Sequence, residues 1–136
     1  MNSRDSSLKS IRLDCISNTI KTDMSSEEHF QNSVLRPIIK FQNDLLIAAF
    51  LNFSSKYKNV FFELSTEKKI TYIENALAKD SKFRNSLKDA VVGLFTVEEY
   101  NLYTANASAL NKRMLGIIKE RLISHIQLLT ERGPTT

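Results

Sequence analysis

Apolar residues recur every three or four positions from residue 25 onward, which is the period of an amphipathic α-helix. The clearest run follows an i, i+4, i+7, i+8, i+11 series: Phe83, Leu87, Ala90, Val91 and Leu94. Nowhere do apolar and polar residues alternate over more than a few positions, so the pattern gives no sign of β-strands. We therefore expect an all-α fold, a bundle of about five or six helices.

Capping residues predict where these helices begin and end. The expected N-caps carry a side-chain oxygen just before an apolar pattern starts: Ser25, Ser65 or Thr66, Asp80 and Thr96. Glu28 and Glu99 stand three residues after Ser25 and Thr96 and complete the capping-box pattern. We expect a break near Asn106, and Gly133 should end the last helix after about residue 131.

The segment around Pro37 predicts a short helix and a long one. Proline removes a helical hydrogen bond, so we expect a helix to about residue 35, a kink or short break, and a second helix over residues 37–57. Residues 45–51 are apolar on nearly every face, which predicts central burial or a shared interface. A loop should follow, with Val60, Phe61 and Phe62 turned inward.

The first 24 residues differ from the rest of the chain. They are rich in Ser, Thr and Asn, which are poor helix formers, and their apolar residues are isolated. We expect a flexible or loosely docked arm over residues 1–24 and a helical bundle domain over residues 25–132. The apolar anchors by which this arm could dock on a partner are Leu8, Ile11, Leu13, Ile16 and Ile20.

Composition narrows the class of protein. The 136 residues include only 3 Gly and 2 Pro, which argues against turn-rich sheet folds and glycine-rich phosphate loops. The single Cys15 excludes an intrachain disulfide and fits a reducing compartment. The longest apolar run, residues 45–51, is far shorter than the ~20 residues that span a bilayer, and no signal sequence is evident. We expect a cytoplasmic protein.

The net charge of +4 is mildly basic, and the 19 Lys and Arg are spread along the chain. A nucleic-acid-binding surface usually concentrates such residues, so a solvated mixed-charge surface is the simpler interpretation. Two basic clusters nevertheless stand near predicted helix ends and could contact phosphates. The candidate phosphate-contacting residues are Lys79, Lys82, Arg84, Lys88, Lys112, Arg113 and Lys119.

Residues for catalysis or metal binding are scarce. The two histidines, His29 and His125, are not accompanied by carboxylates at converging helical positions. Cys15 follows Asp14, whose charge raises the pKa of a thiol, and no nucleophile elbow is present. The adjacent glutamates at the two capping boxes are explained by capping. We expect no enzymatic activity, no cofactor and no metal.

Four segments resemble a family of small uncharacterised bacterial proteins of similar length. They are residues 35–43 (LRPIIKFQN), 72–76 (YIENA), 83–87 (FRNSL) and 93–100 (GLFTVEEY), and the resemblance covers about three quarters of the chain. Some members carry the label "glyoxalase". Glyoxalase-type proteins use a βαβββ module and a metal held by His and Glu side chains, and this sequence predicts neither, so we expect no glyoxalase activity.

These patterns favour a non-enzymatic helical module that binds a larger protein partner. The alternative is a nucleic-acid- or ribosome-associated accessory protein that uses the basic clusters. We expect a monomer, with the arm and the loop around residue 61 covering the apolar helix, rather than a two-fold dimer. Deletion of residues 1–24 should then provoke association.

Overall fold

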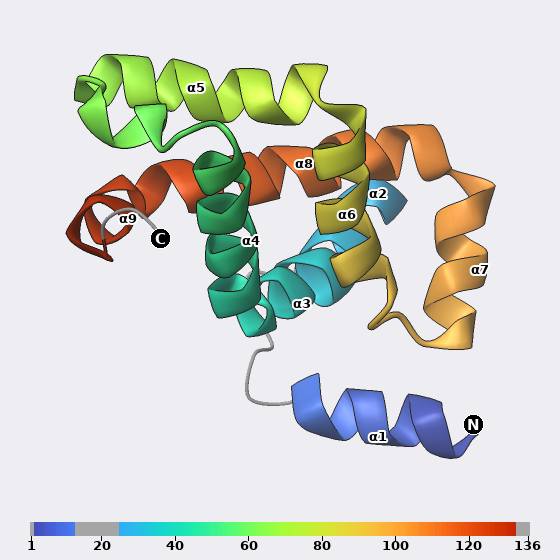
Figure 1. Cartoon of the computed structure of the whole chain (residues 1–136). Helices are drawn as coiled ribbons and strands as arrows, with labels where there is room; N and C mark the ends of the chain where they lie inside the picture. Colours follow the sequence, from blue (N-terminus) through green and yellow to red (C-terminus); the bar gives the residue numbers. More distant parts are fainter. Residues whose placement is uncertain (1, 13–24, 133–136) are drawn as a thin grey trace. The chain divides into compact units, whose positions relative to one another are not determined.

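The computed structural model describes residues 2–12 and 25–132 of the chain, and 87% of these residues are helical (Figure 1). No strand occurs among them, which confirms the predicted all-α fold. Within the described ranges no helix is both long enough and apolar enough to cross a membrane.

The helical elements follow one another with short connections. In chain order they are α1 (Ser3–Arg12), α2 (Ser26–Phe30), the π-helical η2 (Gln31–Leu35), α3 (Arg36–Phe41), α4 (Asn43–Lys56), the 3-10 helix η3 (Val60–Glu63), α5 (Thr66–Lys79), α6 (Ser81–Val92), α7 (Val97–Ala105), α8 (Ala107–Ser124) and α9 (Ile126–Arg132).

The chain divides into two compact units. Unit 1 comprises residues 1–42 and 88–117, and unit 2 comprises residues 43–87 and 118–136. The predicted division into an arm over residues 1–24 and a helical bundle domain over residues 25–132 stays a prediction. Because α6 and α8 each contribute residues to both compact units, no break in the sequence pattern marks the division between them.

The predicted helix starts agree with the structure. Ser25, Ser65 and Thr96 are N-caps whose side chains accept a backbone N–H three residues later, and Thr96 forms a complete capping box with Glu99. Asp80 accepts the N–H of Phe83 at 2.9 Å and caps α6. These bonds satisfy amides that the first helical turn leaves without partners.

Two helix breaks are predicted less well. Residues 26–41 are continuously helical through Pro37, and the break comes at Gln42. The π-helical turn η2 accommodates the proline, because Arg36 N–H bonds back five residues to Gln31 and the wider turn relieves crowding before the ring. Near the C-terminus, α8 ends at a turn at His125, whereas the sequence predicts one helix to residue 131.

The apolar helix at residues 45–51 is only partly buried. In α4 the side chains of Leu46, Ile47 and Phe50 are inaccessible to solvent, but Leu45 is 52% exposed. Within one chain, one face of α4 is therefore not covered, and the alternative of an interface shared between copies stays a prediction. In the following loop Phe61 is buried as predicted, whereas Val60 is exposed.

Each unit has an apolar interior with aromatic contacts. In unit 1 the ring of Phe95 packs edge-on against Phe30 at 5.6 Å and against Tyr103 at 5.5 Å. In unit 2 Phe50 packs edge-on against Phe61 at 5.0 Å. Burial of each such side chain stabilises the fold by about 1.5–3 kcal/mol.

Part of the predicted arm is helical and docked. Residues 3–12 form α1, whose Asp5 and Arg12 are buried in unit 1. This differs from the expectation of a flexible arm, and the reason is a set of polar contacts made by residues that the apolar pattern did not single out. Residues 13–24, with the predicted anchors Leu13, Ile16 and Ile20, lie outside the described residues.

Candidate interaction surfaces

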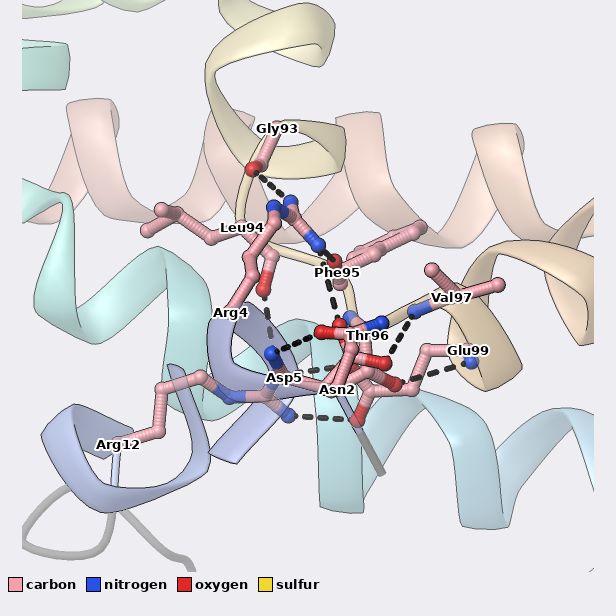
Figure 2. A network of polar contacts seen from close by, with 10 residues as sticks. All are labelled: Asn2, Arg4, Asp5, Arg12, Gly93, Leu94, Phe95, Thr96, Val97 and Glu99. Carbon is pink, nitrogen blue, oxygen red and sulfur yellow. Dashed lines mark hydrogen bonds and ion pairs between the residues drawn. The ribbon is translucent and has the colours of Figure 1, made fainter. Parts of the chain in front are cut away.

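Charged side chains of α1 contact residues 93–99, which comprise the connection between α6 and α7 and the first turn of α7 (Figure 2). Arg4, Asp5 and Arg12 make these contacts; Asp5 and Arg12 are seven residues apart and so share a helical face. We call this set of contacts the α1 latch. Asn2 caps α1 by accepting the N–H of Asp5 at 2.7 Å, so the helix begins at the latch.

The latch pairs opposite charges with the ends of two helices. Arg4 donates from Nη1 to the carbonyl of Phe95 at 2.8 Å and from Nη2 to that of Gly93 at 2.9 Å, just past the C-terminus of α6. Asp5 accepts the N–H of Val97, the first residue of α7, at 3.1 Å. Cations near helix C-termini and anions near N-termini are favoured by the helix dipole.

Arg12 and Glu99 form the buried part of the latch. Arg12 donates from both terminal nitrogens to the two carboxylate oxygens of Glu99, at 2.7 and 2.8 Å, and both residues are largely inaccessible to solvent. Glu99 also accepts the backbone N–H of Thr96 at 2.8 Å. Burial alone raises the pKa of Glu99, but the hydrogen bonds from Arg12 and Thr96 outweigh it and lower the pKa.

A groove lies beside the latch in unit 1, between α2 with η2 and α7. Its volume is about 880 Å³, and we call it the α2–α7 groove. Phe30, Val34 and Leu110 line it and are buried, whereas Leu102 is 58% exposed. The remaining lining residues are polar, charged or small: Lys9, Ser26, Glu27, His29, Ser33, Thr96, Glu98, Glu99, Ala105 and Asn106.

Glu27 ties one rim of this groove to the start of α8. It accepts a hydrogen bond from Asn106 at 3.0 Å and pairs with Arg113 at 3.3 Å. The Asn106 hydrogen bond is the main cause that lowers the pKa of Glu27; burial opposes it, and the hydrogen bond and charge of Arg113 lower the pKa further. Arg113 also donates to Gln31 at 2.9 Å, so three elements of unit 1 meet at this rim.

The groove contains a serine and a histidine, but they are not arranged for catalysis. Ser33 donates its hydroxyl proton to the backbone carbonyl of His29 at 2.6 Å. The Nδ1 atom of the His29 ring lies 3.4 Å from the Ser33 hydroxyl oxygen. A nucleophile needs its proton directed at a base. Among the described residues, no group of three or more His, Cys, Asp or Glu side chains is placed to hold a metal ion.

A second groove, in unit 2, is lined by lysines and aromatic residues. Its volume is about 860 Å³, and we call it the lysine groove. It is lined by Phe53, Lys56, Tyr57, Lys58, Val60, Tyr72, Asn75, Ala76, Lys79, Asp80, Ser81 and Lys82. Tyr57 donates its hydroxyl to Asp80 at 3.2 Å, which raises the pKa of Tyr57. The hydrogen bond from the Phe83 N–H is the main cause that lowers the pKa of Asp80; burial opposes it, and the Tyr57 hydroxyl and Lys82 lower the pKa further.

The predicted phosphate-contacting residues are divided between the two units. Lys79, Lys82, Arg84 and Lys119 belong to unit 2, and Lys88, Lys112 and Arg113 belong to unit 1. Only Lys79 and Lys82 line the lysine groove. Arg84 instead donates to the carbonyls of Leu77 and Ala78 at the end of α5, a capping role. Arg113 is engaged with Glu27.

The predicted docking anchors in α1 are not its main contacts. Leu8 is half-buried and Ile11 is exposed, while the buried residues of α1 are Asp5 and Arg12. An analysis based on apolar periodicity cannot find a helix that docks through charge. A signal was present: Asp5 and Arg12 stand seven residues apart, a spacing that places them on one face of a helix.

Sequence reasoning also missed Lys56 and Lys58. They follow the apolar helix and lie more than twenty residues from Lys79 and Lys82, so sequence clustering could not group the four lysines. The turn at residues 57–59 and the packing of the helices of unit 2 bring the four lysines to one groove.

Comparisons with known proteins do not assign the chain to a family. No family model, no curated protein and no solved structure matches it. The resemblance noted in the sequence therefore stays a prediction, and the two grooves are the features of the structure that bear on function.

Proposed function

We propose that this protein is a non-enzymatic helical interaction module that binds a short amphipathic helix of a partner protein in the α2–α7 groove. The observation that carries the proposal is Leu102, which is 58% exposed on the wall of a groove lined by Phe30 and Val34. Large apolar side chains that are exposed beside an apolar groove are typical of helix-binding surfaces.

The size of the groove suits such a helix. An α-helix with its side chains is about 10 Å across and rises 5.4 Å per turn, so about two turns correspond to the volume of about 880 Å³. Two turns present apolar anchors at i, i+3, i+4 and i+7, the usual recognition pattern. A partner helix of this length would contact Leu102 and the apolar floor together.

The charges of the groove select a basic partner. Its lining includes Glu27, Glu98 and Glu99 against Lys9, in a chain whose net charge is +4. Glu99 is neutralised by Arg12, and Glu98 is exposed with no ion pair among the described residues. Lysine or arginine flanking the apolar anchors of the partner would pair with Glu98 and Glu27.

The absence of an organised nucleophile or base in the groove supports a binding role rather than catalysis. The single Cys15 supports the further proposal that the protein acts in the cytoplasm, since a lone thiol is stable in a reducing compartment.

The proposal is tested with a labelled synthetic helical peptide that carries leucine anchors and flanking lysines, by fluorescence anisotropy. Leu102→Ser should weaken binding about tenfold or more, because it removes the exposed apolar contact. Val97→Ser is the matched control: Val97 is 52% exposed on the same helix but does not line the groove. A peptide with glutamates in place of the lysines should bind more weakly. Equal effects of the two substitutions would contradict the proposal.

A further inference from the structure

We infer that the lysine groove of unit 2 binds single-stranded nucleic acid, with its lysines on the phosphates and Tyr57 stacked on a base. This site is separate from the α2–α7 groove and does not depend on the function proposed for it. The inference rests on the surplus positive charge of the groove, an exposed aromatic ring held in a fixed orientation, the strained turn that contributes Lys58, and an adjoining hollow that lengthens the groove.

The positive charge is the first observation. Lys56, Lys58, Lys79 and Lys82 are all exposed, and none forms an ion pair within 4 Å among the described residues. The carboxylate in the lining, Asp80, accepts hydrogen bonds from the N–H of Phe83 and the hydroxyl of Tyr57 and also interacts electrostatically with Lys82. Four lysines against this one carboxylate leave the groove with a surplus of positive charge, which is what a phosphate backbone requires.

The aromatic ring is the second observation. Tyr57 is 51% exposed, its ring centroid lies 4.8 Å from that of Phe53, and its hydroxyl is held by Asp80 at 3.2 Å. Phe53 is in turn stacked on Phe83 at 4.3 Å. One side of the Tyr57 ring is therefore supported, and the exposed part offers a surface for base stacking.

The backbone at Lys58 is the third observation. Lys58 and Asn59 have φ of 60° and 56°, in the left-handed region that a lysine seldom adopts. Asparagine tolerates this conformation, but for a lysine it is strained. The strained turn contributes Lys58 to the lining of the groove, where its charge joins that of Lys56.

The length of the site favours a strand over a free nucleotide. A hollow of about 560 Å³ adjoins the groove and shares Phe53, Lys56, Tyr57, Asp80 and Lys82 with it. Two adjoining hollows that share the rings of Phe53 and Tyr57 provide space for consecutive nucleotides. A duplex would keep its bases stacked inside and leave Tyr57 without a base to contact, so a single strand fits better.

The probe is a labelled oligouridylate, and its binding to the full chain is measured by anisotropy as a function of salt. Binding should weaken with salt, with a slope of about −0.7 per phosphate contacted. Lys56→Ala with Lys79→Ala should lower affinity about tenfold or more. Lys40→Ala with Lys68→Ala removes the same exposed charge outside the groove and should change affinity by less than about twofold.

Two further variants separate stacking and strain from charge. Tyr57→Ala should lower affinity about tenfold, whereas Tyr57→Phe keeps the ring and should retain most of the binding. Lys58→Gly should lower affinity while the melting temperature stays equal or rises, because glycine relieves the left-handed strain.

Three outcomes would overturn the inference. The first is an equal effect of the control pair and the groove pair of lysines, which would indicate binding by bulk charge. The second is equally tight binding of a duplex of the same length, and the third is competition by uridine monophosphate as effective as that by the oligonucleotide. A melting curve for each variant confirms that a loss of binding is not a loss of folding.

Discussion

At the scale of single residues, Arg12 and Glu99 determine whether α1 stays docked. Their bidentate pair is buried, and Glu99 also completes the capping box of α7. Removing one member of a buried pair leaves the other charge without a partner, which is more costly than losing an exposed ion pair. Because α1 is held mainly by these polar side chains, loss of the pair can release it from the surface and let Glu99 contact water.

We predict that Arg12→Ala lowers the free energy of unfolding by less than the ~3–5 kcal/mol typical of a broken buried pair. Glu99→Ala should cost about 1 kcal/mol more, because α7 also loses its cap. Urea unfolding measures both, and hydrogen exchange should show loss of protection in α1. The exposed Ser10→Ala is the control on the same helix; an equal effect of Ser10→Ala and Arg12→Ala would contradict the prediction.

The lowered pKa of Glu99 predicts loss of stability in acid. A carboxyl whose pKa is lower in the folded state stabilises the fold above its unfolded pKa of about 4.3. This stabilisation is lost as the pH falls through the lowered folded pKa, because the unfolded state binds protons first. Urea unfolding from neutral pH to about pH 3 should show the decrease.

Glu99→Gln isolates this contribution from those of Glu27 and Asp80, whose pKa values are also lowered. Glutamine can still accept the Thr96 N–H and keep the capping box, but it does not titrate. The variant should therefore show a shallower decrease in stability toward acid. The same slope as in the parent protein would rule out a contribution from Glu99.

At the scale of elements, capping residues determine where the helices begin, and a π-helical turn accommodates the proline. Residues 26–41 stay helical through Pro37 because η2 widens the turn before it. In α8, Gly116 lies within the helix, and apart from the backbone of that helix no atom lies within 4 Å of the position that a Cβ would take. Such a glycine adds conformational freedom to the unfolded chain without a packing role.

We predict that Gly116→Ala raises the free energy of unfolding by about 0.4–1 kcal/mol, since alanine fits the helix and reduces the entropy of the unfolded state. Thermal or urea unfolding measures the change. Gly93→Ala is the matched control, because its Cβ would lie 3.2 Å from the carbonyl oxygen of Asp89. If Gly116→Ala is no more stable than Gly93→Ala, the position has a packing role after all.

At the scale of the whole molecule, the chain forms two compact units, and α1 belongs to unit 1. The sequence analysis expects that removing residues 1–24 exposes apolar surface and causes association. The latch changes that expectation, because the buried side chains of α1 are charged and Leu8 is only half-buried.

We predict that a chain lacking residues 1–24 stays monomeric but loses stability. Removal of α1 exposes Glu99 and backbone polar groups rather than an apolar face. Multi-angle light scattering of the full and shortened chains gives their masses. A concentration-dependent increase in mass for the shortened chain alone would restore the original expectation of an apolar cover.

The sequence by itself determined the fold class and most helix boundaries. Apolar periodicity and local caps at Ser25, Ser65, Asp80 and Thr96 act over one helical turn, so they can be interpreted without knowing what the helix packs against. The same local logic failed at Pro37, where a π-turn is a second way to accommodate a proline.

Only the tertiary structure decided which residues form the surfaces. Arg12 meets Glu99 across 87 positions of sequence, and Lys56 and Lys58 share a groove with Lys79 and Lys82. Such groupings depend on how helices pack, and a polar side chain gives no periodic signal of its distant partner. The exposure of Leu45 and Leu102 follows from the same packing, because an apolar pattern predicts which face can be buried but not whether another helix covers it.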